Sequence, residues 1–530
     1  RKLGAEIFGL KSRKLGAEIF GLKSRKLGAE ENGFNTLNPM SSARLLQPEV
    51  FSPMSSARLL QPQALVFLPK SMEILALVPG LIAAYIAFTK SPQRAFLDVY
   101  IPVLFFLPEY YRWIAPGLPD PTFSQAAVIP ITVLFLLRYG PQWKFSFTDG
   151  FVFGFAFCVG YSEYLNAGYS EAQNLMFDML SWVVLPYILA KGIIEPHGYR
   201  IEFARRFVFV VFVISIISLY EFKMGMTPFQ MILGKFFPWQ GLGWVTTFRY
   251  GGTRIAGPYG HAILAGVVIM AAIIVQYWLH TSGHWEPDFK KFKVRSLSKS
   301  QIILLGVIGG SVMTMCRGPW IGGVLAFGAI AIGKAKNRKR ASLLVLAALI
   351  VIGIPLGMMA WSYASVGREN ALTESQETAA YRKELIDKYV DIALERSVWG
   401  WGRNTWPKIP GMPSIDNYYL LLALMHGLVA LACLALIIVT LCVRLYWHEM
   451  RKPRAEPPGS SLGFALIAVF LSIAVSIATV YMGGQVIPLF FLMTGWAEGY
   501  LLNPKSPQGM SLTTTTPQIQ SGYKFRRVLF

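Results

Sequence analysis

Long apolar runs without a single charged residue constrain the fold of this chain more than any other feature of its sequence. Residues 262–279, 342–361, 418–443 and 463–487 contain no Lys, Arg, Asp or Glu. A helix needs about 20 such residues to cross the ~30 Å of hydrocarbon in a bilayer, where it satisfies its own backbone hydrogen bonds. The 530 residues are 54% hydrophobic and only 15% charged. The sequence therefore excludes an ordinary soluble protein and predicts an all-α, polytopic helical membrane protein.

Apolar stretches recur along the chain and predict about 12–13 transmembrane helices. We expect them near 73–89, 96–113, 122–138, 149–166, 174–194, 205–222, 259–280, 300–316, 318–333, 342–361, 416–444, 462–482 and 484–502. Lys and Arg cluster in three of the connecting loops, at 290–299, 334–340 and 451–454. Because cytoplasmic loops carry an excess of Lys and Arg, these loops are predicted to face the cytoplasm. The formal net charge of +21 thus reports topology, and we expect no nucleic-acid partner.

The first 71 residues differ from the rest of the chain. RKLGAEIFGLKS occurs at 1–12 and again at 13–24, and PMSSARLLQP occurs at 39–48 and at 53–62. Such units are too short to bury a core, so we expect 1–71 to be a disordered or non-native leader, with Met72 as the natural start. The remaining segments are predicted to be N-terminal transmembrane helices (72–258), central transmembrane helices with the Arg317 hairpin (259–361), a periplasmic loop (362–415), C-terminal transmembrane helices (416–502) and a cytoplasmic tail (503–530).

The longest external segment, 362–415, carries one amphipathic stretch, Thr378–Arg396. Its apolar side chains recur at i, i+4, i+8 and i+11, while charged side chains line the opposite face; the apolar set is Tyr381, Leu385, Tyr389 and Ile392. This spacing is that of one face of an α-helix. We predict a helix that lies on the membrane surface or caps the helical bundle.

Four arginines fall on the side that the basic loops identify as external: Arg249, Arg254, Arg317 and Arg382. The positive-inside tendency does not account for them there. The planar guanidinium fork suits two oxygens of a phosphate, so together they could form a diphosphate clamp. Simpler alternatives remain open: Arg254 and Arg317 as interfacial anchors of their helices, and Arg382 as part of a solvated helix face.

Asp416 precedes a charge-free run and is predicted to lie at the external mouth of that span. It can act as a helix N-cap, with Asn417 or Tyr418 starting the helix, or as a general base that positions an acceptor. His261 and His426 are isolated histidines beside or within apolar helices, where packing is the commoner role.

We expect no metal centre, no disulfide and no cofactor. The four cysteines, Cys158, Cys316, Cys433 and Cys442, lie inside or at the ends of apolar runs without metal-ligand spacing. The chain has only six histidines, and no grouped carboxylates accompany them on a membrane face.

Four motifs occur in one order between about residues 250 and 430, and with them the chain resembles the bacterial O-antigen ligase and O-antigen polymerase family of polytopic membrane glycosyltransferases. The motifs are RIAGPYGHAILAG from Arg254, MCRGPWIGG around Arg317, AYRKELIDKYVDIALERSVWGWGRNTW around Arg382, and DNYYLLLALMHGLVAL from Asp416. Cys316 stands where the family usually has serine, Asp416 stands where ligases carry histidine, and His426 occupies a position that is commonly acidic. The aspartate favours exopolysaccharide polymerisation or protein O-glycosylation over lipid A-core ligation.

The resemblance implies a donor glycan joined through diphosphate to undecaprenol and a hydroxyl acceptor on a glycan or another molecule. It also implies a multi-pass protein of the bacterial inner membrane with a periplasmic site, in contact with membrane lipids and possible other polysaccharide-assembly proteins. Metal-independent direct displacement would invert the anomeric configuration. The implied site has Asp416 and Arg317 as catalytic residues and Arg254, Arg382, Arg249, Asn417, Tyr418 and His261 as substrate-binding residues.

Two other classes of protein remain open from the residues alone. A transporter or flippase for a lipid-linked glycan also needs many spans and phosphate-binding arginines, but it commonly places polar groups at the bilayer midplane. A structural subunit would use the same arginines only to anchor its helices.

Overall fold

The computed structural model describes residues 70–114, 117–238, 240–241, 246–285, 297–412, 414–452 and 461–503. Most of the predicted leader, the basic residues 290–295 and the predicted tail from 504 onward lie outside the described residues. The repeats at the start of the chain and the expected start at Met72 therefore stay predictions.

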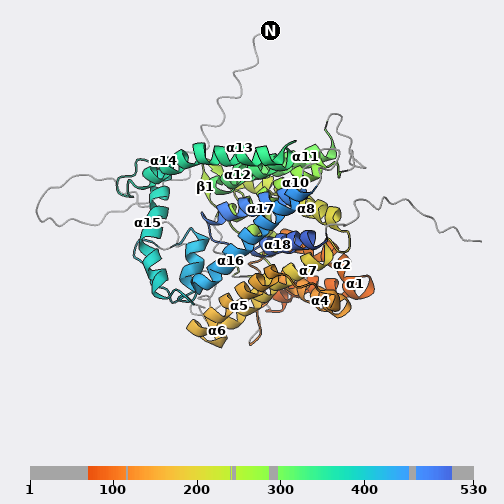
Figure 1. The fold of residues 1–530 in the computed structure, drawn as a ribbon. Helices are drawn as coiled ribbons and strands as arrows, with labels where there is room; N and C mark the ends of the chain where they lie inside the picture. Colours follow the sequence, from red (N-terminus) through yellow and green to blue (C-terminus); the bar gives the residue numbers. More distant parts are fainter. Residues whose placement is uncertain are drawn as a thin grey trace, which may run out of the picture. The chain divides into compact units, whose positions relative to one another are not determined.

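The described residues form helices and one two-stranded hairpin, as Figure 1 shows, which confirms the all-α expectation. The first helices are η2 (Lys70–Leu77), α1 (Val78–Thr89), α2 (Pro92–Ala95), η3 (Phe96–Tyr100), α3 (Ile101–Phe106), α4 (Phe123–Tyr139), η4 (Gly140–Gln142), α5 (Phe147–Ala167), α6 (Tyr169–Asp178), η5 (Met179–Val184), α7 (Leu185–Ile193), α8 (Arg200–Met224) and α9 (Pro228–Leu233). The hairpin is β1 (Phe248–Arg249) and β2 (Gly252–Thr253), followed by η6 (Gly257–Tyr259) and α10 (Ala262–Thr281). The last helices are α11 (Lys299–Thr314), α12 (Arg317–Lys334), α13 (Arg338–Ala348), η7 (Leu349–Gly353), α14 (Ile354–Ala364), α15 (Glu374–Glu395), α16 (Tyr418–Arg451), α17 (Leu462–Ile477) and α18 (Val486–Leu502).

Six helical stretches within the described residues are long and apolar enough to cross a membrane. They are Met72–Thr89, Tyr169–Ile193, Arg200–Met224, Ala262–Thr281, Arg338–Ala364 and Tyr418–Arg451, and shorter apolar helices occur at Phe123–Tyr139, Lys299–Thr314, Leu462–Ile477 and Val486–Leu502. The predicted spans near 149–166 and 318–333 correspond to α5 and α12. The chain is thus a multi-pass membrane protein.

The predicted span near 96–113 is shorter in the structure, because α3 ends at Phe106. Leu107 has an extended backbone, with φ −99° and ψ 138°, and it precedes Pro108. The proline ring disfavours the helical conformation of the residue before it, which ends the helix at this point. Residues 107–113 therefore lie beyond the end of this helix and do not continue it as a membrane span.

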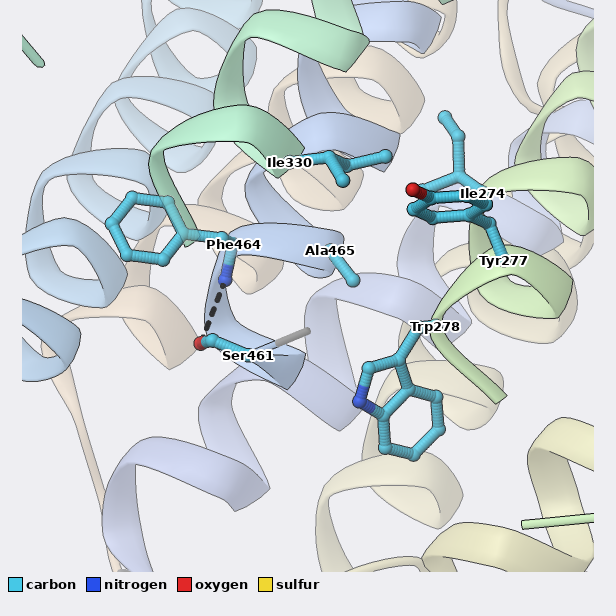
Figure 2. Close-up of a pocket in the computed structure, with 7 residues that line it drawn as sticks. All are labelled: Ile274, Tyr277, Trp278, Ile330, Ser461, Phe464 and Ala465. Carbon is cyan, nitrogen blue, oxygen red and sulfur yellow. Dashed lines mark hydrogen bonds between the residues drawn. The ribbon is translucent and has the colours of Figure 1, made fainter. Parts of the chain in front are cut away.

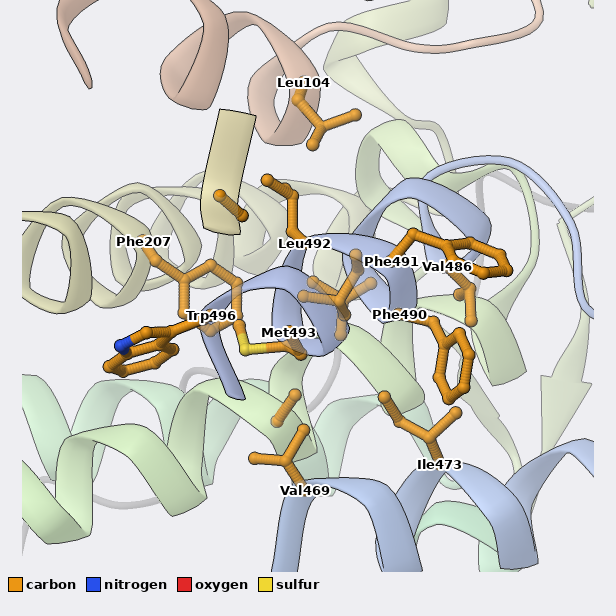
Figure 3. Close-up of a cluster of buried hydrophobic side chains, with 14 of the residues drawn as sticks. Leu104, Phe207, Val469, Ile473, Val486, Phe490, Phe491, Leu492, Met493 and Trp496 are labelled. Atoms are coloured by element: carbon orange, nitrogen blue, oxygen red, sulfur yellow. The ribbon is translucent and has the colours of Figure 1, made fainter. Parts of the chain in front are cut away.

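The core lies where α10, α17 and α18 pack against α3 and α8. Figure 3 shows this cluster, in which Leu104, Phe207, Ile473, Phe490 and Trp496 are among the buried side chains. α10 is buried along almost all of its length, whereas the apolar segment 338–364 is exposed throughout. Two equally apolar segments therefore differ in environment, since one packs among helices and the other presents its side chains outward toward the position of the hydrocarbon.

The amphipathic helix exists as α15 and packs on the start of α16, which is the capping alternative (Figure 1). Leu385 and Tyr389 are fully buried, and Tyr381 and Ile392 pack beside them, so the predicted apolar face is confirmed. This packing holds the polar side of α15 next to the ends of neighbouring helices.

A break in α16 accommodates the loop that follows α15. Gly427 has φ +82°, and a Cβ there would lie 2.0 Å from the carbonyl oxygen of Val398. The N–H of Trp401 donates to the carbonyl of Leu424 at 2.9 Å, which ties the loop to the broken turn. Only glycine allows this backbone conformation together with so close an approach.

Candidate functional site

The turn between α11 and α12 forms the centre of the candidate site. Met315 ends α11 in the left-handed region, with φ +50°, and Cys316 is the extended residue before α12. Arg317 is then the first residue of α12. A left-handed conformation is uncommon for a residue with a side chain, and here it reverses the chain in two residues. The predicted hairpin around Arg317 is therefore present.

Two further arginines bind this turn from the segment before α10. The Arg254 side chain donates through Nε to the carbonyl oxygen of Thr314 at 3.1 Å, and its Nη2 lies 2.8 Å from Cys316 Sγ. Arg249 donates through Nη1 to the carbonyl oxygen of Met315 at 2.8 Å. The three arginines therefore meet at residues 314–317. Arg249 and Arg254 come from more than 60 positions before Arg317 in the sequence.

The charge of this cluster is not neutralised by protein carboxylates. Within the described part of the chain, no Asp or Glu forms an ion pair with any of the three arginines, whereas Arg403 pairs with Glu163 at 3.1 Å. Burial lowers the pKa of Arg249, and the charges of Arg254 and Arg317 lower it further. Arginines brought together without a counter-ion form a site that favours an anion.

The start of α12 adds to this preference for negative charge. No side chain caps its N-terminus, so the first backbone N–H groups of the helix are left for another acceptor. The N-terminal end of a helix also carries a partial positive charge. Together with Arg317, this end of α12 provides donors and charge of the kind that bind phosphate groups.

Arg317 itself is exposed and links two other elements. Its Nη1 donates to Ser375 Oγ on α15 at 3.0 Å, and its Nε donates to Tyr250 Oη at 3.2 Å. Tyr250 lies at the tip of the β1–β2 hairpin. The guanidinium thus holds only neutral hydroxyl groups as hydrogen-bond acceptors.

Arg382 reaches the same region from two turns farther along α15. Its Nη2 donates to the carbonyl oxygen of Thr479 at 3.2 Å, and its buried Nε has no protein partner. Gly318 packs against the same threonine, since a Cβ at Gly318 would lie 2.4 Å from Thr479 Oγ1. Arg382 and the residue after Arg317 therefore contact one residue, Thr479, at the end of α17.

Asp416 lies near Arg382 and is partly buried. Its Oδ1 accepts a hydrogen bond from Ser414 Oγ at 3.3 Å. Burial raises the pKa of Asp416, and the charge of Arg382 partly offsets that rise. Burial also lowers the pKa of Arg382, while Asp416 opposes that change. The two side chains thus act on each other at the start of α16.

The helix cap is Asn417 and not Asp416. The side-chain Oδ1 of Asn417 accepts the N–H groups of Tyr419 at 3.0 Å and Leu420 at 3.3 Å, so the capping role that Asp416 could have filled is wrong. Tyr418 is the first helical residue and packs against the main core. The carboxylate of Asp416 is therefore not used to hold the helix.

The histidines have structural positions. His261 caps α10, with Nδ1 accepting the N–H of Ile263 at 3.2 Å, and burial with the nearby charge of Arg254 lowers its pKa to about 4. It is therefore neutral at pH 7. His426 is buried, with Nδ1 3.3 Å from Ser162 Oγ, in agreement with the packing role expected for it.

Sequence reasoning did not identify two buried glutamates that position the site. Glu221 accepts the N–H groups of Ala256 at 2.9 Å and Gly257 at 2.8 Å, which fixes the turn directly after Arg254. Glu163 pairs with Arg403 and thereby ties the loop between α15 and α16 to α5. A carboxylate at the end of an apolar run was the available signal, because such a group is rarely buried without partners.

An apolar pocket, shown in Figure 2, lies elsewhere. It is lined by Ile274, Tyr277, Trp278, Ile330, Ser461, Phe464 and Ala465. Tyr277 and Trp278 belong to the last turns of α10, and Ser461 directly precedes α17. The arginine cluster lies at the opposite ends of these two helices, beside His261 and Thr479. The pocket is therefore separate from the candidate site.

A family model described as O-Antigen ligase matches residues 302–435. The match includes the turn around Arg317, the whole of α15 with Arg382, and Asp416 with the first half of α16. Arg249 and Arg254 lie before it. No curated protein matches the chain. The match confirms the resemblance to the O-antigen ligase family and supports a glycosyl-transferring membrane protein that acts in glycan assembly.

Proposed function

We propose that this protein transfers or polymerises a glycan from an undecaprenyl-diphosphate donor onto a hydroxyl acceptor at the periplasmic face of the bacterial inner membrane. The observation that carries this proposal is the group of arginines without carboxylate partners at the uncapped start of α12. A diphosphate supplies the anionic oxygens that such a group would bind. The match of residues 302–435 to O-Antigen ligase supports the chemistry of glycan transfer.

The orientation of α12 supports a periplasmic site. The helix begins at Arg317, whereas Lys334 ends it and Arg338 follows in the next loop. Lys and Arg in short loops between spans favour the cytoplasmic side. The arginine cluster is at the other end of the helix, which is the side that the donor glycan would occupy.

The proposed reaction is a single displacement. The acceptor hydroxyl oxygen forms a bond to the anomeric carbon while the bond from that carbon to the diphosphate oxygen breaks, and the electron pair leaves with undecaprenyl diphosphate. Asp416 accepts the hydroxyl proton, and attack opposite the leaving group inverts the anomeric configuration. Arg317, Arg254 and Arg382 stabilise the charge that develops on the diphosphate, so the residues present need no metal ion for this role.

Asp416 also bears on the type of acceptor. The carboxylate stands where ligases of the resembled family carry histidine, and this favours polymerisation or protein O-glycosylation over ligation to lipid A-core. Burial raises the pKa of Asp416, which makes the carboxylate a better proton acceptor.

Reconstitution tests the proposed function directly. The purified full chain in lipid vesicles is expected to form new glycosidic bonds when given an undecaprenyl-diphosphate oligosaccharide and an acceptor glycan, measured as products of higher mass. Translocation of the donor without new bonds would identify a flippase. Neither product nor translocation would leave a structural subunit, and each of these results contradicts the proposal.

Replacing Arg382 with Gln is expected to move the acidic limb of the kcat/KM profile to higher pH. Arg382 opposes the rise in the pKa of Asp416, so removal of its charge raises that pKa further. Below the raised pKa, Asp416 is protonated and cannot accept the proton. Arg382→Lys keeps the charge and should leave the limb near its wild-type position. An unmoved limb in Arg382→Gln would mean that Asp416 is not the titrating base.

A further inference from the structure

The tip of the β1–β2 hairpin carries a backbone conformation that its sequence does not favour. Phe248 pairs with Thr253 and Arg249 with Gly252, which leaves Tyr250 and Gly251 as a two-residue turn. Their φ angles are +53° and +74°. Turns of this kind prefer Asn, Asp or Gly at both positions, since an ordinary side chain is strained there. A tyrosine at the first position points to a role for its side chain.

The Tyr250 side chain contacts the Nε–Nη2 edge of the Arg317 guanidinium. Tyr250 Oη accepts hydrogen bonds from both Nε and Nη2 of Arg317, and the guanidinium carbon lies 5.8 Å from the centre of the Tyr250 ring. Nε and Nη2 form one of the paired donor edges with which arginine binds two oxygens of a phosphate. The hydroxyl therefore occupies the position that a phosphate oxygen would take.

A phosphate oxygen can replace the Tyr250 hydroxyl in this contact. Tyr250 is 73% exposed, so its hydroxyl leaves Arg317 without opening the core. The hydrogen bond from Arg317 lowers the pKa of Tyr250, because the guanidinium favours negative charge at this oxygen. An anionic phosphate oxygen makes a stronger hydrogen bond than a neutral phenol does. A diphosphate would thus displace the tyrosine.

We infer that Tyr250 is a placeholder ligand: its hydroxyl occupies the diphosphate-binding edge of Arg317 in the empty site and is displaced by the donor. This inference rests on the proposed function. The hairpin then competes with the lipid-linked glycan donor. Tyr250 keeps Arg317 oriented in the empty site, and it weakens the binding of that donor. Tyr250 is then a specificity-determining residue, because only a ligand with enough negative charge can replace it.

The test is a binding titration of the full chain in detergent with undecaprenyl diphosphate and, separately, with inorganic pyrophosphate. Tyr250→Phe removes the competing hydroxyl and is expected to lower the Kd for both ligands about tenfold. Tyr169→Phe, which removes an exposed hydroxyl on α6, is the matched control and should leave both Kd values at the wild-type level.

Arg317→Ala separates this inference from the proposed function. If wild type and Arg317→Ala bind undecaprenyl diphosphate equally well, the arginine site itself is wrong. If Arg317→Ala binds more weakly but Tyr250→Phe binds no more tightly, only the placeholder role is wrong. Weaker binding of undecaprenyl diphosphate by Tyr250→Phe would instead mean that the Tyr250 hydroxyl contacts the bound ligand directly. In the background of Arg317→Ala, the gain from Tyr250→Phe is expected to disappear.

Discussion

Arg317→Ala is expected to lower kcat/KM for glycan transfer by about 10²- to 10³-fold, the usual effect of removing one charge-stabilising donor from a transition state. Arg317 is exposed, and within the described residues its side chain donates hydrogen bonds to the hydroxyl groups of Ser375 and Tyr250. Its removal therefore opens no cavity in the core, and the protein should insert in the membrane at its normal level. The measurement is polymer formation per unit of folded protein, with insertion followed by immunoblotting of membranes.

Two further variants sharpen this result. Arg317→Lys keeps the charge but loses the two-pronged donor edge, so it should recover only part of the activity. Arg368→Ala removes an arginine between α14 and α15 that contacts Gly411 and Glu384, and it should leave transfer unchanged. Wild-type polymer formation by Arg317→Ala would reduce Arg317 to an anchor of the α11–α12 turn.

Asp416→Asn is expected to lower kcat by about 10²- to 10⁴-fold, the range associated with loss of a general base. The amide is nearly isosteric with the carboxylate but accepts no proton. Because Asn417 caps α16, the substitution leaves the helix start intact. Steady-state kinetics with the reconstituted protein measure the effect, and the acidic limb of the pH profile should disappear with the base.

A second aspartate provides the comparison for Asp416. Asp387 lies on α15, the helix that carries Arg382, and pairs with Lys383 on the helix surface. Asp387→Asn makes the same chemical change away from the arginines, and it should retain full activity. Full activity in Asp416→Asn as well would remove the general-base role and leave the carboxylate a partner of Arg382 alone.

The fold was predictable where the signal is local. The apolar face of α15 follows from side chains spaced three or four residues apart, and Leu385 and Tyr389 are buried as that spacing requires. The end of α3 was missed, although Pro108 is visible in the sequence, because a count of apolar residues does not register the restriction that proline places on the backbone of Leu107. The cap of α16 was also not decided, since Asp416 and Asn417 are both good capping residues.

The candidate site depends on contacts that no local pattern contains. The sequence identified Arg249, Arg254, Arg317 and Arg382 by residue type and predicted side of the membrane, and long charge-free apolar runs alone predicted a multi-pass helical protein. Only the packing of α10, α11, α15 and α17 brings these side chains together, three of them at the turn between α11 and α12 and Arg382 at Thr479. Periodicity follows from the geometry of a single helix, whereas the meeting of distant residues depends on which helices pack together and at what depth.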